Sequence, residues 1–516
     1  MNTDIDVAIL GGGLAGALLV RLLRLQRPEL RVLCLERSET TSWKVGEATV
    51  ELFSNHLLRR LGLSTYLYEQ HLPKNGLRFF FDRREKDAPL EAMSEIGSQS
   101  LPYHPSFQLD RAELERELRA DAGRRGAEFL AGAKVLDVEV GAPHRVTFAH
   151  GGRERTVRAR WIVDATGRAS LLAKRLDLRL PVRDHHCLAA WARLRGVRDL
   201  DGPDVDLAFR DRVRHTSRRL STVHFVHRGY WIWLIPLRGG VTSLGVVGDH
   251  RRLSREVLTP DGLRAFAAGH RALAALLEGA EWLDFGGYGR LAHATRQWFG
   301  DRWAVVGEAA AFSDPFYSPG SDFITLANEL CADLIARDHD GEAIAERQRL
   351  YDGYLQYRYA ANLPLYQDQY ELFGSFDLLR ARWDFDVASY YNLWLEDYLQ
   401  DRHFDLDHLQ KEQRQAPFVL RALQRFGALF SACERAVTAR GDYERNNLGR
   451  FVEGLGAIGF ARDLGRRDRA AIDAEALRIF ALARERCFEL LGRPTGAVQP
   501  GFTDYVTGRA LAGALD

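Results

Sequence analysis

The sequence predicts an α/β protein in which a parallel sheet with flanking helices carries an inserted antiparallel sheet and ends in a helical region. Three patterns support this prediction. A glycine-rich turn at residues 11–16 joins an apolar strand to a helical run, which is typical of a βαβ unit. Residues 185–250 are rich in β-branched and aromatic residues with period-two stretches, which favours antiparallel strands. From residue 339 onwards, helical periodicity replaces the strand patterns.

The composition is that of a soluble globular protein of two or three domains. The chain has 516 residues, of which 46% are hydrophobic and 27% charged, and its formal net charge is +1. We therefore expect no nucleic-acid partner. No long apolar run predicts a membrane span, and no secretion signal is recognisable. The five cysteines form no CxxC pair and no metal-ligand spacing is present, so we expect no metal site and a cytoplasmic location.

The glycine-rich turn Gly11-Gly12-Gly13-Leu14-Ala15-Gly16 follows the apolar run Asp6–Leu10. One glycine allows the tight turn, one lets the backbone approach a pyrophosphate, and one lets the helix pack on the strand. The helix then presents free N–H groups and a positive dipole end to an anion. Glu36 ends the next strand, about 20 positions after the last glycine, where an acid suits a ribose hydroxyl. The unit predicts a dinucleotide site.

Three further segments combine glycine with a strand end or a helix start. Small residues surround the glutamate of Trp43–Val50, which predicts either a loop close to a ligand or an ordinary helix entry. The strand ending in Val163–Arg168 carries an acid and a glycine at its end. The turn Asp314–Gly320 precedes a helix, and such a turn delivers backbone N–H groups to one place.

A lysine and two tryptophans are the candidates for chemistry outside the glycine turns. Lys74 lies in a Pro–Gly bend before the apolar strand Leu77–Phe81, where a lysine is usually just solvated. Trp231, Trp233 and Ile235 alternate along a predicted strand and therefore point to one face. An ordinary core face accounts for this alternation, but two adjacent indoles also make a rigid wall that excludes water. The aromatic residues of 351–394 either line a pocket or form core.

On these residues the sequence resembles the flavin-dependent halogenases, a tryptophan-halogenase-like branch of the two-domain FAD monooxygenases with a glutathione-reductase-like fold. The glycine fingerprint and Asp164–Gly167 are shared widely among FAD enzymes, whereas Val45–Thr49 is more specific. Trp231-x-Trp233-x-Ile235-Pro236 is similar to the family's hallmark, and Pro73-Lys74-x-Gly76 looks like the stretch with its essential lysine, nearer to the phenol and pyrrole branches.

The resemblance implies a role for each of these positions. Lys74 is the implied catalytic residue, and Ser318 and Gly320 are the implied halide site. The implied tunnel wall is Trp231, Trp233, Ile235 and Pro236. The implied FAD-binding residues are Gly11, Gly13, Ala15, Gly16, Glu36, Arg37, Gly46, Glu47, Ala48, Thr49, Arg111, Asp164, Gly167, Glu308, Pro315 and Gly320.

The resemblance also implies a reaction. A separate flavin reductase supplies FADH2 by diffusion, and with O2 this cofactor converts bromide or chloride into hypohalous acid. The acid passes through a tunnel to Lys74, which polarises it or carries the halogen as a haloamine, and an electron-rich aromatic carbon then attacks the halogen. The substrate is a small aromatic molecule, free or carrier-bound. With one strong glycine fingerprint in the sequence, we expect no tight nicotinamide site.

Three residues depart from the family pattern. Tyr317 stands where the tryptophan halogenases carry a glutamate, which argues against free tryptophan as the substrate. Glu308 replaces an aspartate, and Pro319 falls where the family offers a backbone N–H to the halide, a group that proline lacks. A flavin-dependent monooxygenase or dehydrogenase on the same scaffold is therefore the alternative. A flavin-binding protein without turnover is a third hypothesis, favoured if Lys74 forms a salt bridge away from any tunnel.

The resemblance gives the expected domains. Residues 1–184 and 285–338 are expected to form the FAD-binding core, with parts of the substrate side in 50–110. Residues 185–284 are expected to form the sheet domain with the tryptophan wall, and residues 339–516 the helical C-terminal domain.

Overall fold

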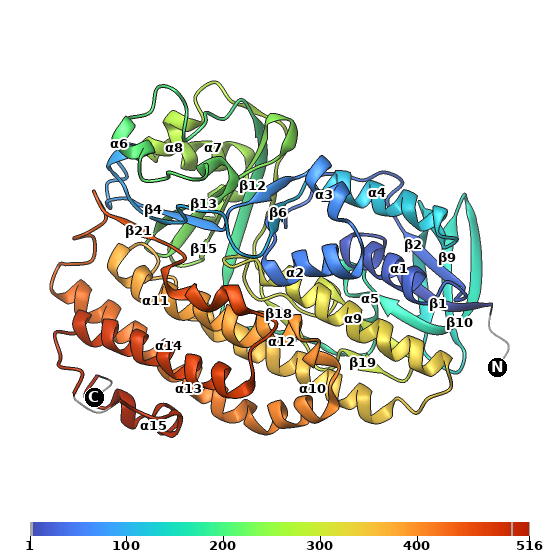
Figure 1. Ribbon diagram of the computed structural model, residues 1–516. Coiled ribbons are helices and arrows are strands. Elements are labelled where there is room, and N and C mark those ends of the chain that lie inside the picture. Colours follow the sequence, from blue (N-terminus) through green and yellow to red (C-terminus); the bar gives the residue numbers. More distant parts are fainter. Residues whose placement is uncertain (1–3, 497–498, 515–516) are drawn as a thin grey trace.

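The structure is a computed structural model that describes residues 4–496 and 499–514. The outermost residues of the expected ranges 1–184 and 339–516, and residues 497–498, lie outside the described part. The parallel sheet with its helices forms one side of the molecule, a second sheet lies beside it, and the C-terminal helices run beneath both (Figure 1). No helix in the described residues is long and apolar enough to cross a membrane.

The first sheet has the strand order β19-β20-β10-β1-β2-β7, with the β8–β9 meander paired to β10. The central strand β1 pairs in parallel with β10 and β2, and its residues Val7–Leu10 are fully buried because helices cover the sheet. The strands are β1 (Ile5–Leu10), β2 (Val32–Glu36), β7 (Glu128–Ala131), β8 (Lys134–Glu139), β9 (His144–His150), β10 (Arg153–Asp164), β19 (Phe299–Gly300) and β20 (Trp303–Val305).

The second sheet has the order β16-β12-β15-β14-β13-β4-β5-β21, with β17 also paired to β12. Its strands from 187–249 are antiparallel, but β13 pairs in parallel with β4, and β5 with β21, so the sheet is mixed rather than antiparallel. Its strands are β4 (Leu77–Phe81), β5 (Ser94–Gly97), β12 (Cys187–Arg195), β13 (Thr222–His227), β14 (Tyr230–Pro236), β15 (Val241–Asp249), β16 (Glu281–Trp282), β17 (Gly286–Tyr288) and β21 (Phe451–Glu453).

Strands β4, β5, β17 and β21 come from outside residues 185–284. The expectation that strand structure stops at 339 is therefore wrong at β21, which completes the edge of the second sheet. Alternation and composition indicate that a strand exists, but they do not show which distant strand supplies its hydrogen-bond partners. Two short ribbons stand apart: β3 (Leu72–Lys74) pairs with β6 (Ser106–Gln108), and β11 (Arg179–Pro181) with β18 (His293–Thr295).

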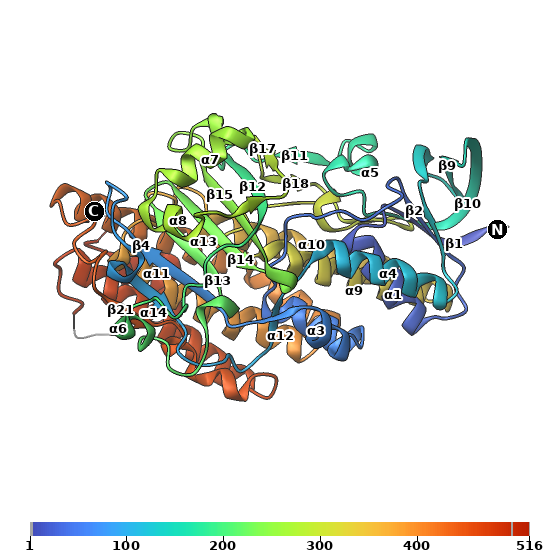
Figure 2. The same cartoon turned by 90° about the horizontal axis from the view of Figure 1, so that it is seen from above.

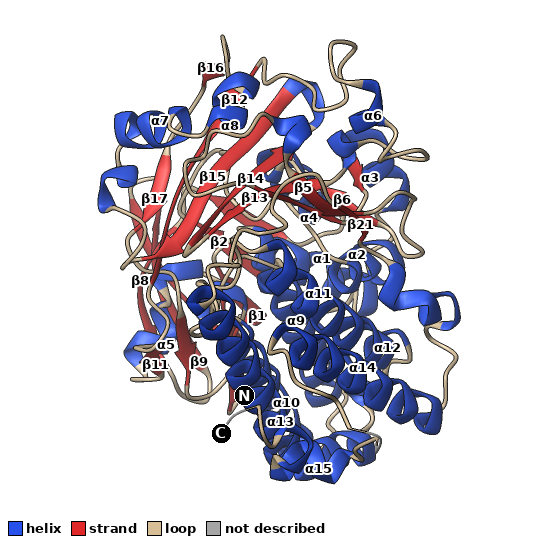
Figure 3. Ribbon diagram, turned by 90° about the vertical axis from the view of Figure 1, so that its left-hand side faces the viewer, coloured by secondary structure: helices blue, strands red, loops and turns tan. Residues whose placement is uncertain are grey.

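Most helices of the first 340 residues lie on the side of the first sheet, whereas α6, α7 and α8 lie beside the second sheet, seen from above in Figure 2. They are α1 (Leu14–Gln26), α2 (Glu51–Asn55), α3 (Ser64–Gln70), α4 (Arg111–Arg124), α5 (Leu171–Arg175), α6 (Leu207–Arg210), α7 (Pro260–Ala268), α8 (Arg271–Leu276) and α9 (Pro319–His339). The C-terminal helices gather on one side of the two sheets (Figure 3). They are α10 (Ala345–Asn362), α11 (Phe376–Ser389), α12 (Glu396–Leu399), α13 (Leu406–Ala439), α14 (Arg469–Leu490) and α15 (Phe502–Thr507).

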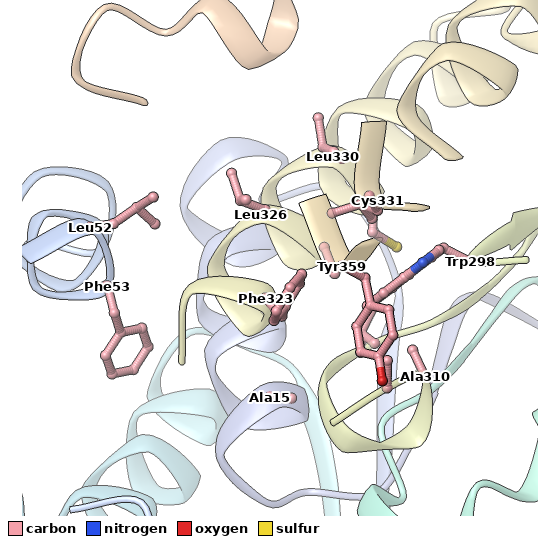
Figure 4. Close-up of a cluster of buried hydrophobic side chains, with 14 of the residues drawn as sticks. Ala15, Leu52, Phe53, Trp298, Ala310, Phe323, Leu326, Leu330, Cys331 and Tyr359 are labelled. Atoms are coloured by element: carbon pink, nitrogen blue, oxygen red, sulfur yellow. The ribbon is translucent and has the colours of Figure 1, made fainter. Parts of the chain in front are cut away.

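Helix α9 connects these layers. Phe323, Leu326 and Leu330 lie at helical spacing and are buried in one cluster with Ala15 of α1 and Phe53 of α2, as Figure 4 shows. Both α1 and α2 belong to the region that the sequence predicts to bind FAD. Burial of this apolar face therefore holds α9 against that region. The packing holds the N-terminal end of α9 at the junction of the two sheets, where the candidate site lies.

Candidate functional site

The structure explains separately why three positions of the glycine-rich turn are occupied by glycine. Gly11 has φ +99°, and a Cβ there would lie 2.4 Å from the Ala165 oxygen. A Cβ at Gly16 would lie 1.9 Å from the Gly11 oxygen, so this glycine lets α1 pack against the turn. At Gly13 the space is open, with only the Lys44 ammonium nearby at 3.8 Å. An open backbone at a helix N-terminus with a lysine beside it fits a pyrophosphate.

Glu36 at the end of β2 uses both carboxylate oxygens to hold this turn. Oε2 accepts the Gly12 N–H at 2.8 Å and Oε1 accepts the Ser38 N–H at 2.9 Å. Arg37 is exposed beside it. The contact of Glu36 with a ribose therefore stays a prediction, while its part in shaping the turn is visible.

Most of the remaining implied cofactor residues meet in one cavity, which we call the flavin cleft. The cleft contains Arg111, the wall tryptophans, and two of the implied glycines, Gly46 and Gly320. Its other implied residues are Glu47, Ala48, Ile235, Glu308, Pro315 and Ser318, and it adds Leu14, Val45, Arg168, Ala189, Trp191, Thr222, His224, Tyr288, Leu291, Phe312, Ser321 and Ile324. Gly46 has φ +95°, and a Cβ there would lie 2.8 Å from the Arg111 guanidinium. Backbone at this point therefore passes close to the cleft without a side chain.

Two implied cofactor residues have their carboxylates occupied by protein groups. Asp164 accepts both the N–H and the hydroxyl of Thr166, at 2.9 and 2.6 Å, and the Leu172 N–H at 2.7 Å. Glu47 is buried and forms an ion pair with Arg193 of β12 at 2.9 Å. Asp164 thus shapes the loop that ends in Gly167, and Glu47 attaches its segment to the second sheet. Any direct contact of these groups with FAD stays a prediction.

The tryptophan wall lies on one face of β14. The ring centroids of Trp231 and Trp233 are 5.7 Å apart, and both rings and Ile235 are buried. Trp233 donates its indole N–H to Ser243, and Gly245 on the neighbouring strand leaves room for its ring, because a Cβ there would lie 2.1 Å from it. Pro236 ends the strand and is absent from the cleft lining. Two satisfied indoles side by side make a rigid surface.

A buried hydrogen-bond chain, which the sequence analysis missed, ties this wall to the turn before α9. Trp231 donates to the Tyr370 hydroxyl at 3.2 Å, and Tyr370 donates to Asp314 at 2.6 Å. The same Asp314 oxygen contacts the His185 ring at 2.8 Å. Ligand-type atoms of His185, Cys187 and Asp314 lie within 4.8 Å of one another. We assign the cluster a structural role, since its carboxylate oxygen already has two hydrogen-bond partners. The position of Asp314 directly before Pro315 was its only local signal.

Lys74 lies on the other side of this turn, at the end of β3. Its side chain is 4% exposed, and its ammonium donates to the Thr49 carbonyl at 2.5 Å. Among residues 4–496 and 499–514, no carboxylate lies within ion-pairing distance of it. Burial lowers the pKa of Lys74 from 10.5 to about 8, although Glu51 and Asp322 act in the opposite direction. A buried lysine without a paired charge is costly for stability and is therefore a candidate for chemistry.

Lys74 lines a second cavity, which we call the lysine chamber. Its walls are mostly aliphatic and aromatic, and they include part of the aromatic set of 351–394: Tyr357, Tyr366, Trp383, Phe385, Tyr390, Tyr391 and Trp394. Other members of that set are packed in the core away from this lining, among them Tyr351, Tyr354, Phe373 and Phe376. Both alternatives for these aromatics therefore apply. Tyr317 also lines the chamber and donates to Asp386 at 2.9 Å.

The first turn of α9 separates the two cavities. Ser318 and Gly320 line the flavin cleft, whereas Pro319 and Asp322 line the lysine chamber. Pro319 is the first helical residue, a position where the missing N–H costs the helix nothing. Ser318 before it has φ +56°, a strained conformation for serine. The backbone N–H of Gly320 is the first donor that α9 offers to an anion in the cleft.

The chain is similar to known flavin-dependent proteins. Residues 4–235 match the family model of the FAD binding domain. The flavin-dependent halogenase chlA of Dictyostelium discoideum is 28% identical over 450 residues, covering 78% of this chain and 73% of the relative. A chlorinase of 1H-pyrrole-2-carbonyl-peptidyl-carrier protein from Pseudomonas fluorescens is 26% identical over 345 residues, covering 61% and 72%.

Among solved structures, the halogenase PltM in complex with phloroglucinol and FAD has the same fold. Its TM-score is 0.66 at 18% identity, covering 99% of this chain and 96% of that one. The predicted fold class and the predicted FAD cofactor are thereby confirmed. On its family model and its curated relatives, the chain is a flavoprotein similar to the flavin-dependent halogenases.

Proposed function

We propose that the protein halogenates an electron-rich aromatic substrate, with hypohalous acid made in the flavin cleft and relayed to Lys74 in the lysine chamber. One observation carries the proposal: the first turn of α9 faces both cavities, with the implied cofactor residues on one side and a buried, unpaired lysine on the other. This arrangement separates the oxidant from the substrate, as halogen transfer to a chosen carbon requires.

The residues of the cleft suit FAD. The open backbone at Gly13 takes the pyrophosphate, and Gly46 and Gly320 leave space along the ring. When bound as FADH2, the cofactor supplies with O2 the oxidant that turns halide into hypohalous acid. The Gly320 N–H and the positive end of α9 bind the halide, and Ser318 completes that side of the cleft. Trp231 and Trp233 keep the aromatic substrate out of the cleft.

The environment of Lys74 suits both roles expected of it. With a pKa of about 8, both protonation states are populated near neutral pH. The ammonium form donates hydrogen bonds that polarise hypohalous acid, and the neutral form is a nucleophile that carries the halogen as a haloamine. The aromatic walls of the chamber then hold the substrate ring close to it. A lysine lining a cavity with no partner carboxylate also speaks against the hypothesis of flavin binding without turnover.

The proposal includes two partners. A separate reductase supplies FADH2, since the chain has one strong glycine fingerprint and that fingerprint serves the flavin. The substrate is a small aromatic compound, free or attached to a carrier protein; the named substrate of the Pseudomonas fluorescens relative, a pyrrole bound to a carrier, supports the second form. The proposed location is the cytoplasm.

An assay with purified protein, FAD, a flavin reductase, NADH and bromide tests the proposal, with phenols and indoles as substrates and mass spectrometry as the readout. We expect brominated product from the native protein, flavin binding without bromination from Lys74→Ala, and native activity from the exposed control Lys174→Ala. Hydroxylated product without halogen would instead support the monooxygenase alternative. Full activity of Lys74→Ala would refute the relay.

A further inference from the structure

The lysine chamber contains a buried acid, Asp322, with one oxygen that has no hydrogen-bond partner among the described residues. Asp322 lies in the first turn of α9, is 7% exposed and lines the chamber together with Lys74 and Glu51. Its Oδ1 atom is buried and has no hydrogen-bond partner among the described residues. A buried polar atom without a partner costs free energy, so a native protein that keeps one calls for an explanation.

The other two acids of the chamber differ from Asp322 in the protein groups that hold them. Glu51 accepts a hydrogen bond from the Tyr391 hydroxyl at 2.7 Å. Asp386 is held by Arg382 at 2.7 Å and by Tyr317. Asp386 Oδ1 is likewise buried without a partner, but the other oxygen of Asp386 forms an ion pair, whereas Asp322 is without an ion pair in the described part of the chain.

The groups around Asp322 shift its pKa in opposite directions. Burial raises the pKa of Asp322 from 3.8 to about 8, and the neighbouring Glu51 adds to the rise. Arg358, the Phe53 backbone and the Tyr390 hydroxyl act in the opposite direction. Lys74 faces the same chamber with a pKa also near 8. A carboxyl and an amine with matched proton affinities across one aromatic cavity can exchange protons with a bound molecule.

We propose that Asp322 is a second catalytic residue, which binds the hydroxyl group of a hydroxylated aromatic substrate and accepts its proton during halogen transfer. The inference rests on the proposed halogenation and names its preferred substrate class, the phenols. Asp322 Oδ1 is the hydrogen-bond acceptor for the substrate hydroxyl. The aromatic walls of the chamber contact the substrate ring and hold its reacting carbon towards Lys74.

The proton balance of the step is closed. The O–H bond of the phenol breaks as Asp322 takes its proton, and electron density moves into the ring. A ring carbon forms a bond to the halogen of hypohalous acid, the halogen–oxygen bond breaks, and the departing hydroxide takes a proton from the Lys74 ammonium to form water. The neutral Lys74 amine then removes the ring proton, and Asp322 returns its proton to the oxygen. Phenol and hypohalous acid become halophenol and water, with both side chains restored.

Bromination of 2-naphthol and of indole, measured side by side, tests this role because only the first substrate has a hydroxyl. We expect Asp322→Asn to lower kcat/KM for 2-naphthol at least tenfold more than for indole, and Asp322→Glu to restore part of the preference. Asp340→Asn, at the exposed C-terminal end of the same helix, is the matched control. Equal losses for both substrates, or no loss for 2-naphthol, would overturn the proposal.

Binding to the native protein gives a readout that needs neither turnover nor a variant. We expect 2-naphthol to quench the tryptophan fluorescence with at least tenfold higher affinity than 2-methoxynaphthalene, which cannot donate a proton. Equal affinities would overturn the role of Asp322 even if bromination occurs. Absence of bromination with every substrate, together with preferential 2-naphthol binding, would reject the halogenation and keep the hydroxyl site.

Discussion

Replacing Lys74 by methionine should stabilise the protein while abolishing halogenation. Methionine is unbranched like lysine, one atom shorter, and has no charge, so it fits the apolar chamber. The folded pKa of Lys74, about 8, lies below its ordinary value of 10.5, so the folded state disfavours the protonated form. Below pH 8 this penalty is complete, at about 3 kcal/mol, from about 1.36 kcal/mol for each pKa unit.

The penalty should fall as the pH rises. Between pH 8 and 10.5 the unfolded chain binds more protons than the folded chain, so the stability of the native protein increases with pH there. At pH 9.5 the remaining penalty is about 1 kcal/mol. The variant also loses the hydrogen bond to Thr49, worth about 1 kcal/mol. The net gain for Lys74→Met is therefore about 2 kcal/mol at pH 7 and close to zero at pH 9.5.

Urea unfolding of the flavin-free protein, followed by circular dichroism at both pH values, measures this difference. The exposed Lys174→Met variant is the control and should match the native protein at both. A Lys74→Met variant that is less stable than the native protein at pH 7, or a stability gap that does not shrink at pH 9.5, would refute the account of Lys74 as an unpaired buried charge.

Further predictions concern the cleft and its attachments. Gly16→Ala places a methyl group against the turn backbone and should abolish FAD binding in a flavin titration. The control Gly123→Ala in α4, with open space around it, should bind FAD normally and gain up to about 1 kcal/mol in its free energy of unfolding. Normal FAD binding by Gly16→Ala would contradict the packing argument. Among the described residues, Glu47→Gln leaves the Arg193 guanidinium with Asp284, at 3.2 Å, as its charged partner. Urea unfolding should then show a loss of about 3 kcal/mol in the free energy of unfolding. A loss below about 1 kcal/mol would mean that the ion pair is dispensable. Trp231→Phe removes the donor to Tyr370 and should raise the ratio of hydroxylated to halogenated product measured by mass spectrometry, and an unchanged ratio would argue against the wall.

Much of the fold could be predicted from local patterns. The strand, glycine turn and helix of residues 6–26 follow from hydrophobic periodicity and from the steric freedom of glycine, and the structure shows that a side chain at Gly11, Gly12 or Gly16 would collide with neighbouring atoms. The alternation of Trp231 and Trp233 likewise fixed their common face. Such patterns could not predict which strands pair, because β21 pairs with β5, which lies more than 350 residues earlier in the chain.

The candidate site also combines features that local sequence motifs predict with features that depend on tertiary contacts. The sequence by itself determined the dinucleotide loop, the tryptophan pair and the lysine in its Pro–Gly bend, since each is a local motif with its own backbone geometry. Only the tertiary structure decided that the lysine is buried and unpaired, that one turn of α9 separates cleft from chamber, and that Asp322 completes the chamber. Burial, pKa and cavity shape arise from contacts between segments far apart in the chain, and no local pattern encodes those contacts.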